Sequence, residues 1–246
     1  MDAIYTRQLQ LPMSYCNHLG RLSYTDTCTI FMNAACDDAQ QRGFGLTYIQ
    51  QRNLFWLTVH AKYRFYRMPA MLTDLTVQTW PGKLRFGLSK RYYTLQDENG
   101  LCAEALTDWA LYDNSEQKIT SVLDKEFSEQ AVNEKNGCDP KRANIDKDFT
   151  GCDIFGTYTV TSNDIDPGQH MNNVAYIRML FGMMSTEEVD NLHLCELDIS
   201  YLTPVLEGTS LTVYIREKED GNEYGIFRSE TPCTLIKLIK KENHHE

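Results

Sequence analysis

One plan that occurs twice along the chain most limits how this sequence can fold. Residues 1–123 and residues 149–246 each open with a short strand pattern, pass through a glycine-containing turn into a helix pattern, and continue into several strand patterns. Gly20 and Gly168 occupy matching places in the two turns under this alignment. A helix followed by a run of antiparallel strands, twice, predicts an α+β fold made of two helix-on-sheet units.

The stretch between the two copies differs from both in composition. It is rich in charged residues and turn formers, as in the run EFSEQAVNEKNGCDPKRANIDKD. Such a composition is typical of a surface linker or of a long excursion from a domain. We therefore predict an N-terminal domain over residues 1–123, a linker over 124–148 and a C-terminal domain over 149–246.

Both helix patterns carry the usual signals of helix formation. In the first copy, Ser23 followed by Asp26 resembles a capping box, and Gly43 is a natural stop. Periodic apolar residues then predict one buried face on each helix. These residues are Ile30, Ala34 and Ala35 in the first copy, and Val174, Ile177, Phe181 and Met184 in the second.

Strand patterns follow each helix. They span residues 54–66, 73–80, 84–95 and 101–113 in the first copy, and 196–205, 209–217, 223–229 and 232–240 in the second. Within 101–113, apolar residues alternate with mostly polar ones, which predicts a strand with one buried face. The alternating residues are Leu101, Ala103, Ala105, Trp109 and Leu111.

Composition and charge exclude several classes of protein. Among the 246 residues, 24 Lys and Arg stand against 34 Asp and Glu, so the net charge of −10 disfavours a nucleic-acid binder. The eight cysteines form no C-x-x-C pair, which disfavours a zinc ribbon and favours reduced thiols. Because the sequence shows no signal-peptide pattern and no long apolar run, we expect no membrane span and a cytoplasmic location.

The densest cluster of polar residues lies directly before the second helix pattern. It contains Asp166, Gly168, His170, Asn172 and Asn173. A helix N-terminus carries positive partial charge and free N–H groups, which polarise a carbonyl and stabilise an oxyanion. In such a place Asp166 can act as a general base or nucleophile, while His170 can orient water or bind the substrate carbonyl.

Two other interpretations of this cluster follow from the residues alone. Asn172 or Asn173 can cap the helix while Asp166 forms an Asx turn, and this structural interpretation weighs about as much as the functional one. A metal site needs more ligands than Asp166 and His170 supply. We expect neither a metal nor a cofactor.

The motif D-x-x-x-H-M-N-N-x-x-Y entering an apolar helix resembles the signature of hotdog-fold thioesterases. From about residue 5 to residue 235, the chain is similar to the acyl-(acyl carrier protein) thioesterase family, whose members carry two tandem hotdog domains. Several residues of the first copy also fall where that family has them: Pro69, Asp74, Thr79, Trp80, Pro81, Arg91 and Trp109.

The resemblance implies two tandem hotdog domains, each a long central helix wrapped by an antiparallel sheet. It implies that the two domains pair within the chain and leaves a homodimer open. It also implies hydrolysis of acyl-(acyl carrier protein) thioesters to free fatty acid and carrier protein, which ends chain elongation. Asp166, His170 and Asn172 match catalytic residues, whereas Asn173 and Gly168 are expected to position substrate.

Two departures from the family pattern bear on the mechanism. The family often has Asn in place of Gly168, and a Glu-Cys pair in place of Pro204 and Val205. Without that cysteine no thiol nucleophile is expected, so Asp166 must act on water or on the thioester directly. An acyl-CoA thioesterase and a non-catalytic acyl-thioester binding protein remain alternatives.

Two further expectations concern the first copy. His18 and Leu22 align with Asp166 and His170, which predicts one reactive site per chain. A basic stretch lies between two strand patterns, and it is either solvated edge charge or a docking surface for an acidic carrier protein. Its cations are Lys83, Arg85, Lys90 and Arg91.

Overall fold

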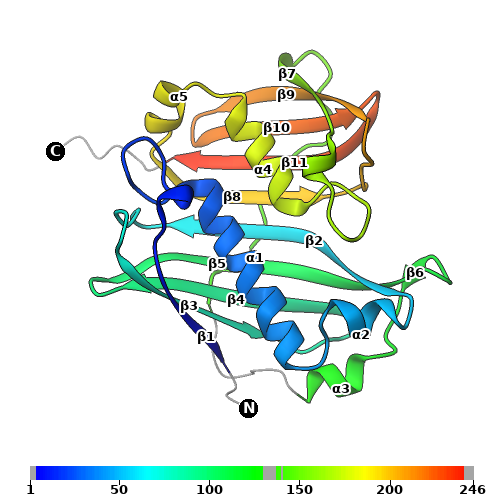
Figure 1. Ribbon diagram of the computed structural model, residues 1–246. Helices are drawn as coiled ribbons and strands as arrows, with labels where there is room; N and C mark the ends of the chain where they lie inside the picture. The colour runs from blue at the N-terminus through cyan, green and yellow to red at the C-terminus, as the bar shows by residue number, and fades with distance from the viewer. Residues whose placement is uncertain (1–3, 130–136, 140, 241–246) are drawn as a thin grey trace. The chain divides into compact units, whose positions relative to one another are not determined.

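The computed structural model describes residues 4–129, 137–139 and 141–240. The chain divides into two compact units, one up to residue 140 and one from residue 141 (Figure 1). Each unit is an antiparallel sheet with helices, so the predicted α+β class is confirmed. The exact domain boundaries and the expected pairing of the two halves stay predictions.

The first unit contains a five-stranded antiparallel sheet in the order β1-β3-β4-β5-β2, with a short strand β6 added to β5. Its strands are β1 (Tyr5–Gln10), β2 (Leu54–Phe65), β3 (Asp74–Pro81), β4 (Leu88–Asp97), β5 (Gly100–Asp113) and β6 (Lys118–Ile119). Its helices are η1 (Met13–Tyr15), α1 (Tyr24–Gln41), α2 (Leu46–Gln50) and α3 (Asp124–Ser128).

The second unit repeats this topology. Its sheet has the order β7-β9-β10-β11-β8, which is the order of the first sheet element for element. The strands are β7 (Asp153–Thr159), β8 (Leu194–Tyr201), β9 (Ser210–Lys218), β10 (Gly221–Arg228) and β11 (Thr231–Lys240). The helices are η2 (Ser162–Asp164), α4 (Asn173–Gly182) and α5 (Thr186–Asp190). The repeat predicted from the sequence is therefore a repeat of structure.

Helix α1 forms where the sequence predicts it. The Ser23 hydroxyl accepts the Asp26 N–H at 2.9 Å, and the chain leaves the helix through Gly43 at φ +82°. The predicted face of Ile30, Ala34 and Ala35 is buried. Between them, Phe31 packs its ring on Tyr63 of β2 and Tyr93 of β4, which seats the helix on the sheet.

Helix α4 is shorter than the expected long central helix, with 10 residues against 18 in α1. Met184, which the spacing places on this helix, lies beyond its end at Gly182. The physical reason is the next residue along the chain. Ser185 and Glu188 form a capping box that starts α5, and this new N-terminus ends the preceding helix.

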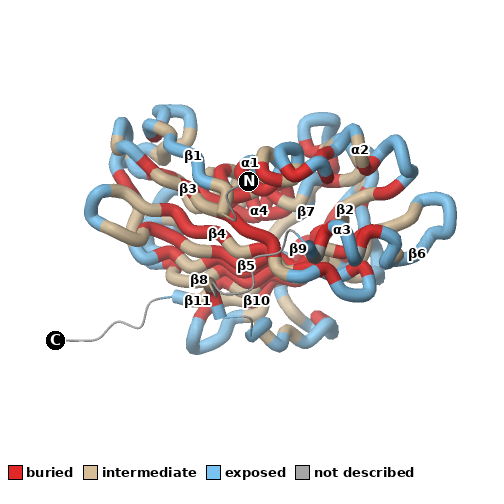
Figure 2. Tube along the Cα trace, turned by 90° about the horizontal axis from the view of Figure 1, so that it is seen from below, coloured by how far each residue is buried: buried red, intermediate tan, exposed pale blue. Residues whose placement is uncertain are grey.

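Two strand predictions in the first copy are also corrected. Strand β4 begins at Leu88 rather than at residue 84, because Phe86 and Gly87 take left-handed φ values of +52° and +71°. Strand β5 has two buried faces along its middle instead of one (Figure 2). Leu106 and Ala110, on the face that the pattern leaves to solvent, are fully buried.

Part of the predicted linker covers that second face. Gly137 lies against the rings of Tyr92 and Trp80, and Tyr92 pairs with Leu106 across the sheet. Cys138 is buried. The packing of Gly137 and Cys138 on the sheet fits the long excursion among the two interpretations of this stretch, and the bounds 124–148 stay a prediction.

Both ends of residues 124–148 are packed as well. Phe127 of α3 enters a buried cluster with Phe44, Ile49 and Leu54, and the Ala143 N–H donates to the buried carboxylate of Asp198 at 3.0 Å. These contacts tie the stretch to the two units. Residues 130–136 and 140, which belong to the same predicted linker, lie outside the described residues.

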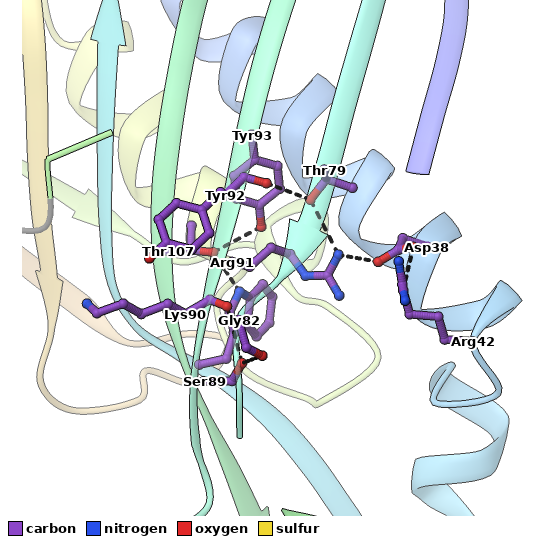
Figure 3. Close-up of polar contacts among 11 residues, drawn as sticks. Asp38, Arg42, Thr79, Gly82, Ser89, Lys90, Arg91, Tyr92, Tyr93 and Thr107 are labelled. Carbon is purple, nitrogen blue, oxygen red and sulfur yellow. Dashed lines mark hydrogen bonds and ion pairs between the residues drawn. The ribbon is translucent and has the colours of Figure 1, made fainter. Parts of the chain in front are cut away.

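A buried ion-pair cluster joins α1 to β4 (Figure 3). The Asp38 carboxylate accepts from Arg42 Nε at 2.7 Å and from Arg91 Nη1 at 2.6 Å. All three residues are less than a tenth exposed. Arg91 is therefore a structural residue and not a solvated charge at the sheet edge, because it is buried in an ion pair with Asp38 of α1. Lys90 binds Asp108 at 2.8 Å.

Asp38→Asn is predicted to cost about 3–5 kcal/mol of unfolding free energy, because it leaves two buried guanidinium groups without their anion. Asp37→Asn is the matched control. Its carboxylate pairs with Arg7 at 2.9 Å, and both side chains are about half exposed, so the predicted cost stays below about 1 kcal/mol. Urea unfolding of the two variants measures the difference. Equal costs would contradict the structural role of the cluster.

Candidate active site

The polar cluster of the second copy forms a tight loop between η2 and α4. Asp166 donates its N–H to the His170 carbonyl at 3.0 Å, and Gln169, at φ +62°, donates to the Asp166 carbonyl at 2.9 Å. At the base of the loop, the Met171 N–H binds the Val205 carbonyl at 2.8 Å. Main-chain hydrogen bonds therefore hold Asp166 and His170 in one small loop.

The structural roles that the sequence allows are both present. The Asn172 Oδ1 accepts the Val174 N–H at 2.8 Å and caps α4. The Asp166 Oδ1 accepts the Gly168 N–H at 2.7 Å, which is an Asx turn. These contacts orient the carboxylate, and they are compatible with a reactive role for it.

The environment of Asp166 makes it a better base than an ordinary aspartate. The side chain is half-buried, and this burial raises its pKa. The backbone N–H groups of Gly168 and His170 and the nearby His170 imidazole act in the opposite direction without cancelling the rise in pKa. A carboxylate whose pKa is raised by partial desolvation is a candidate for proton transfer.

His170 offers a polar atom that the described residues do not satisfy. Its Nδ1 is buried and has no hydrogen-bond partner among them. Leaving a buried imidazole nitrogen unbonded is costly, so its natural partner is a water molecule or a substrate oxygen. His170 and Asp166 together supply a base and a polar group on one loop.

Asp164 is a second carboxylate of the loop, and the sequence analysis did not single it out. Its Oδ2 accepts three hydrogen bonds at 2.8 Å, from the N–H and hydroxyl of Thr161 and from the Tyr158 hydroxyl. Burial alone would raise its pKa, but these donors outweigh burial and lower it. Asp164 is therefore an anchor for the loop. The available signal was Thr161-x-x-Asp164, a capping-box spacing.

The remaining predicted residues occupy different surroundings. Asn173 is the first residue of α4, and its carbonyl accepts the Tyr201 hydroxyl at 2.9 Å. Val205 is fully buried, and its carbonyl accepts the Met171 N–H of the loop. The roles of Asn172, Asn173 and Gly168 toward substrate stay predictions, since Asn172 and Gly168 already hold structural contacts.

A buried aromatic side chain lies in the first turn of α4, directly after the loop. Burial raises the pKa of the Tyr176 hydroxyl. The Tyr176 ring packs edge-on against Tyr201 of β8 at a centroid distance of 5.7 Å. This contact packs the start of α4 against the sheet.

The first unit carries the same loop with other side chains. Its Asn17 N–H binds the Arg21 carbonyl at 2.7 Å, as Asp166 binds His170. The Asn17 Oδ1 accepts the N–H groups of Leu19 and Arg21 at 3.1 Å each. Asn17 therefore takes the place of Asp166, and an amide does not act as a base.

This comparison shifts the predicted alignment of the two copies by one residue. Gly20 at φ +67° corresponds to Gln169 at φ +62°, and not to Gly168. It follows that Asn17 and Arg21, rather than His18 and Leu22, match Asp166 and His170. The sequence alignment paired two glycines, whereas the structure pairs the two left-handed residues that close the same turn.

Two further features concern residues 4–129, 137–139 and 141–240. No group of three or more His, Cys, Asp or Glu side chains there could hold a metal ion. No helix there is long and apolar enough to cross a membrane.

Two protein-family models match most of the chain. The family described as "Acyl-ACP thioesterase N-terminal domain" matches residues 2–130, and the family described as "Acyl-ACP thioesterase C-terminal domain" matches residues 150–233. A chloroplastic acyl-[acyl-carrier-protein] hydrolase, FATB3 of Cuphea viscosissima, is 25% identical over 76% of this chain and 51% of its own length. Oleoyl-acyl carrier protein thioesterase 1 of Arabidopsis thaliana is 23% identical over 70% and 52%. The chain spans about half the length of these relatives.

Solved structures share the fold over nearly the full chain. An acyl-ACP thioesterase from Bacteroides thetaiotaomicron has a TM-score of 0.83 at 19% identity, covering 97% of this chain and 98% of its own. The 12:0-ACP thioesterase from Umbellularia californica has a TM-score of 0.85 at 15% identity, covering 97% of each chain. These similarities support the fold and the repeated architecture.

Asp164→Asn and Asp166→Asn are predicted to change stability in opposite directions at pH 7. The folded pKa of Asp164 is lowered, so its ionised form stabilises the fold above the unfolded pKa, and this stability is lost as the pH falls through the folded pKa. The folded pKa of Asp166 is raised, so stability is lost as its carboxyl ionises with rising pH.

Removing the Asp164 charge should therefore lower the unfolding free energy by about 2 kcal/mol, whereas removing the Asp166 charge should leave it equal or higher. Urea unfolding at pH 7 and near pH 3 measures both effects, and each should shrink at the lower pH. Comparable destabilisation by both variants at pH 7 would show that Asp166 is only a structural residue.

Proposed function

We propose that this chain, which belongs to the acyl-ACP thioesterase family, hydrolyses acyl-(acyl carrier protein) thioesters to free fatty acid and carrier protein and so ends chain elongation. The observation that carries the proposal is the loop before α4. It holds a carboxylate of raised pKa beside an imidazole with an unsatisfied buried nitrogen. The same loop carries the residues that match the family signature.

The proposed reaction uses Asp166 as the base. Asp166 takes a proton from water, and the hydroxide adds to the thioester carbonyl. His170 orients the water or the carbonyl, while the N-terminus of α4 stabilises the developing oxyanion. The C–S bond then breaks, and the proton passes from Asp166 to the departing thiolate. In the other route open to the same residues, the Asp166 carboxylate attacks the thioester carbonyl, the C–S bond breaks and the thiolate leaves. Water then hydrolyses the resulting anhydride to fatty acid and Asp166, and the proton released neutralises the thiolate.

A non-catalytic acyl-thioester binding protein is the second candidate. One departure favours it, because Val205 stands where the family has its cysteine and its side chain carries no nucleophile. Turnover separates the two candidates. An assay with acyl-carrier-protein and acyl-CoA substrates of several chain lengths also separates a carrier-protein thioesterase from an acyl-CoA thioesterase.

The setting of the proposed reaction is the cytoplasm. All eight cysteines are free thiols, the state that a reducing compartment maintains. The proposed partner is an acyl carrier protein bearing a fatty acyl thioester. A homodimer is left open.

Asp166→Asn is expected to lower kcat/KM for the preferred acyl thioester by roughly 10²–10⁴-fold, the usual worth of general-base assistance. In the parent enzyme, kcat/KM should rise with pH through a pKa above the ordinary aspartate value, because only the ionised carboxylate accepts a proton. Steady-state kinetics of folded protein measures both. Asn17→Ala, in the corresponding loop of the first unit, is the control and should keep turnover. Near-parental turnover in Asp166→Asn would refute the assignment.

No cysteine is expected to be essential. In the second unit, the Cys195 thiol donates to the Ile239 carbonyl at 3.3 Å and the Cys233 thiol to the Thr231 carbonyl at 3.6 Å. Burial raises the pKa of the Cys233 thiol, which disfavours the nucleophilic thiolate. Cys195→Ser and Cys233→Ser keep a donor and should retain parental kcat. A loss above a hundredfold in either variant, with an unchanged Tm, would establish a thiol nucleophile.

A further inference from the structure

The turn between β3 and β4 carries an unusual residue at its tip. Arg85 and Leu88 exchange main-chain hydrogen bonds of 2.8 and 2.9 Å around Phe86 and Gly87. Both central residues have positive φ, +52° and +71°, as in a type I′ turn, whose first central place favours Asn, Asp or Gly. A bulky aromatic residue there is strained, and the Phe86 side chain is 86% exposed.

The base of this turn is held in place. The Gly87 carbonyl accepts the Leu111 N–H at 2.7 Å, and a Cβ on Gly87 would lie 2.3 Å from the Thr120 carbonyl oxygen. The turn thus packs tightly against β5 and the segment after β6. Phe86 projects from a fixed platform, which is how a preorganised binding anchor is built.

Other exposed apolar side chains accompany Phe86. Leu88 is 46% exposed, Ile119 lies beside Gly87 and is 47% exposed, and Val122 follows at 61%. We refer to Phe86, Leu88, Ile119 and Val122 as the anchor patch. An aromatic residue among smaller exposed apolar residues is the composition of an interaction surface rather than of ordinary solvated surface.

Positive charge lies next to the anchor patch. Two of the four cations of the basic stretch form ion pairs, Lys90 with Asp108 and Arg91 with Asp38. Lys83 and Arg85 are exposed, and within the described residues their side chains form no ion pair or hydrogen bond. The neighbouring Lys118 pairs with Glu116 at 3.3 Å. Two uncompensated cations therefore flank an apolar anchor on a chain of net charge −10.

We infer that the anchor patch, with Lys83 and Arg85, binds the carrier-protein part of an acyl-carrier-protein substrate. This inference rests on the proposed function, which requires the enzyme to recognise a small acidic protein as well as an acyl group. Charge complementarity selects this partner, because cations on an otherwise acidic enzyme attract an acidic protein locally. Phe86 supplies the central apolar contact.

Phe86→Asn separates binding from stability. Asn suits the left-handed turn position, so Tm should rise by a few degrees. Loss of the aromatic anchor should raise KM for the acyl-carrier-protein substrate about tenfold with kcat unchanged. The test is the ratio of kcat/KM for an acyl-carrier protein to that for the same acyl group on pantetheine, and this ratio should fall about tenfold.

Leu72→Asn is the matched control. Leu72 is also an apolar residue at positive φ, +67°, and it is 62% exposed away from the anchor patch. Its replacement relieves the same kind of strain and removes a similar exposed side chain. Tm should rise, and the ratio of the two specificity constants should stay at the parental value.

The charge contribution is tested with the double variant Lys83→Glu/Arg85→Glu. KM for the acyl-carrier protein should rise at low ionic strength, and the difference from the parent should shrink in 0.5 M salt, as screening predicts. An effect on the carrier-protein substrate that is the same at all salt concentrations would contradict charge complementarity.

The outcomes distinguish this inference from the proposed function. If the parent hydrolyses acyl-carrier protein and Phe86→Asn leaves the ratio unchanged, the docking surface is refuted and the function stands. If the parent does not act on acyl-carrier protein, both are refuted. Two other results for Phe86→Asn, each with an unchanged ratio, would also overturn the inference. Loss of pelleting with anionic phospholipid vesicles would assign the anchor patch to membrane binding. Conversion of a dimer to a monomer would assign it to contact with a second copy of the chain.

Discussion

The loop before each helix is the constraint on which the candidate site depends. Its shape is set by main-chain hydrogen bonds, from residue 166 to 170 in the second unit and from 17 to 21 in the first. The first place needs a side-chain oxygen as well, since Asp166 accepts the Gly168 N–H and Asn17 accepts the N–H groups of Leu19 and Arg21. An acid or an amide meets that need, so the loop keeps its shape while its chemistry changes. The second unit presents Asp166 and His170, whereas the first presents Asn17 and Arg21. One scaffold thus presents the pair proposed to be reactive in one copy and an amide with a guanidinium in the other.

Two carboxylates separated by one residue divide the work of this loop. Asp164 faces three donors through one oxygen, which lowers its pKa and ties η2 to the strand before it. Asp166 faces fewer donors in a half-buried place, and its pKa is raised. By giving neighbouring acids opposite environments, a protein can keep one carboxylate ionised for structure and leave the other able to transfer a proton. The contacts of Asp164 hold the loop in which partial burial raises the pKa of Asp166.

Local patterns predicted the elements well, and long-range packing explains what they missed. The Ser23 cap, the buried face of α1 and the place of Asp166 before a helix were readable from short spacings. The second buried face of β5 was not, because residues 137–139 reach it from beyond the strand pattern. The basic stretch could not reveal that Arg91 meets Asp38, since the partner belongs to a distant helix. Asp164 was missed because only the Thr161-x-x-Asp164 spacing marks it, and its third donor, the Tyr158 hydroxyl, comes from the preceding strand.

Two of the residues that break local conformational preference lie where a function is proposed, while others, such as Leu72, lie elsewhere. Gln169 closes the reactive loop in a left-handed conformation that Gly20 occupies without strain in the first copy, and Phe86 takes a turn position suited to Asn or Gly. Such strain persists only where the surrounding structure holds it. Here main-chain bonds hold both: Gln169 to Asp166, and Arg85 to Leu88 across Phe86. The fold therefore draws its stability from the ion-paired and apolar interiors, and this leaves it able to tolerate strained surface turns, including the two at which binding is proposed.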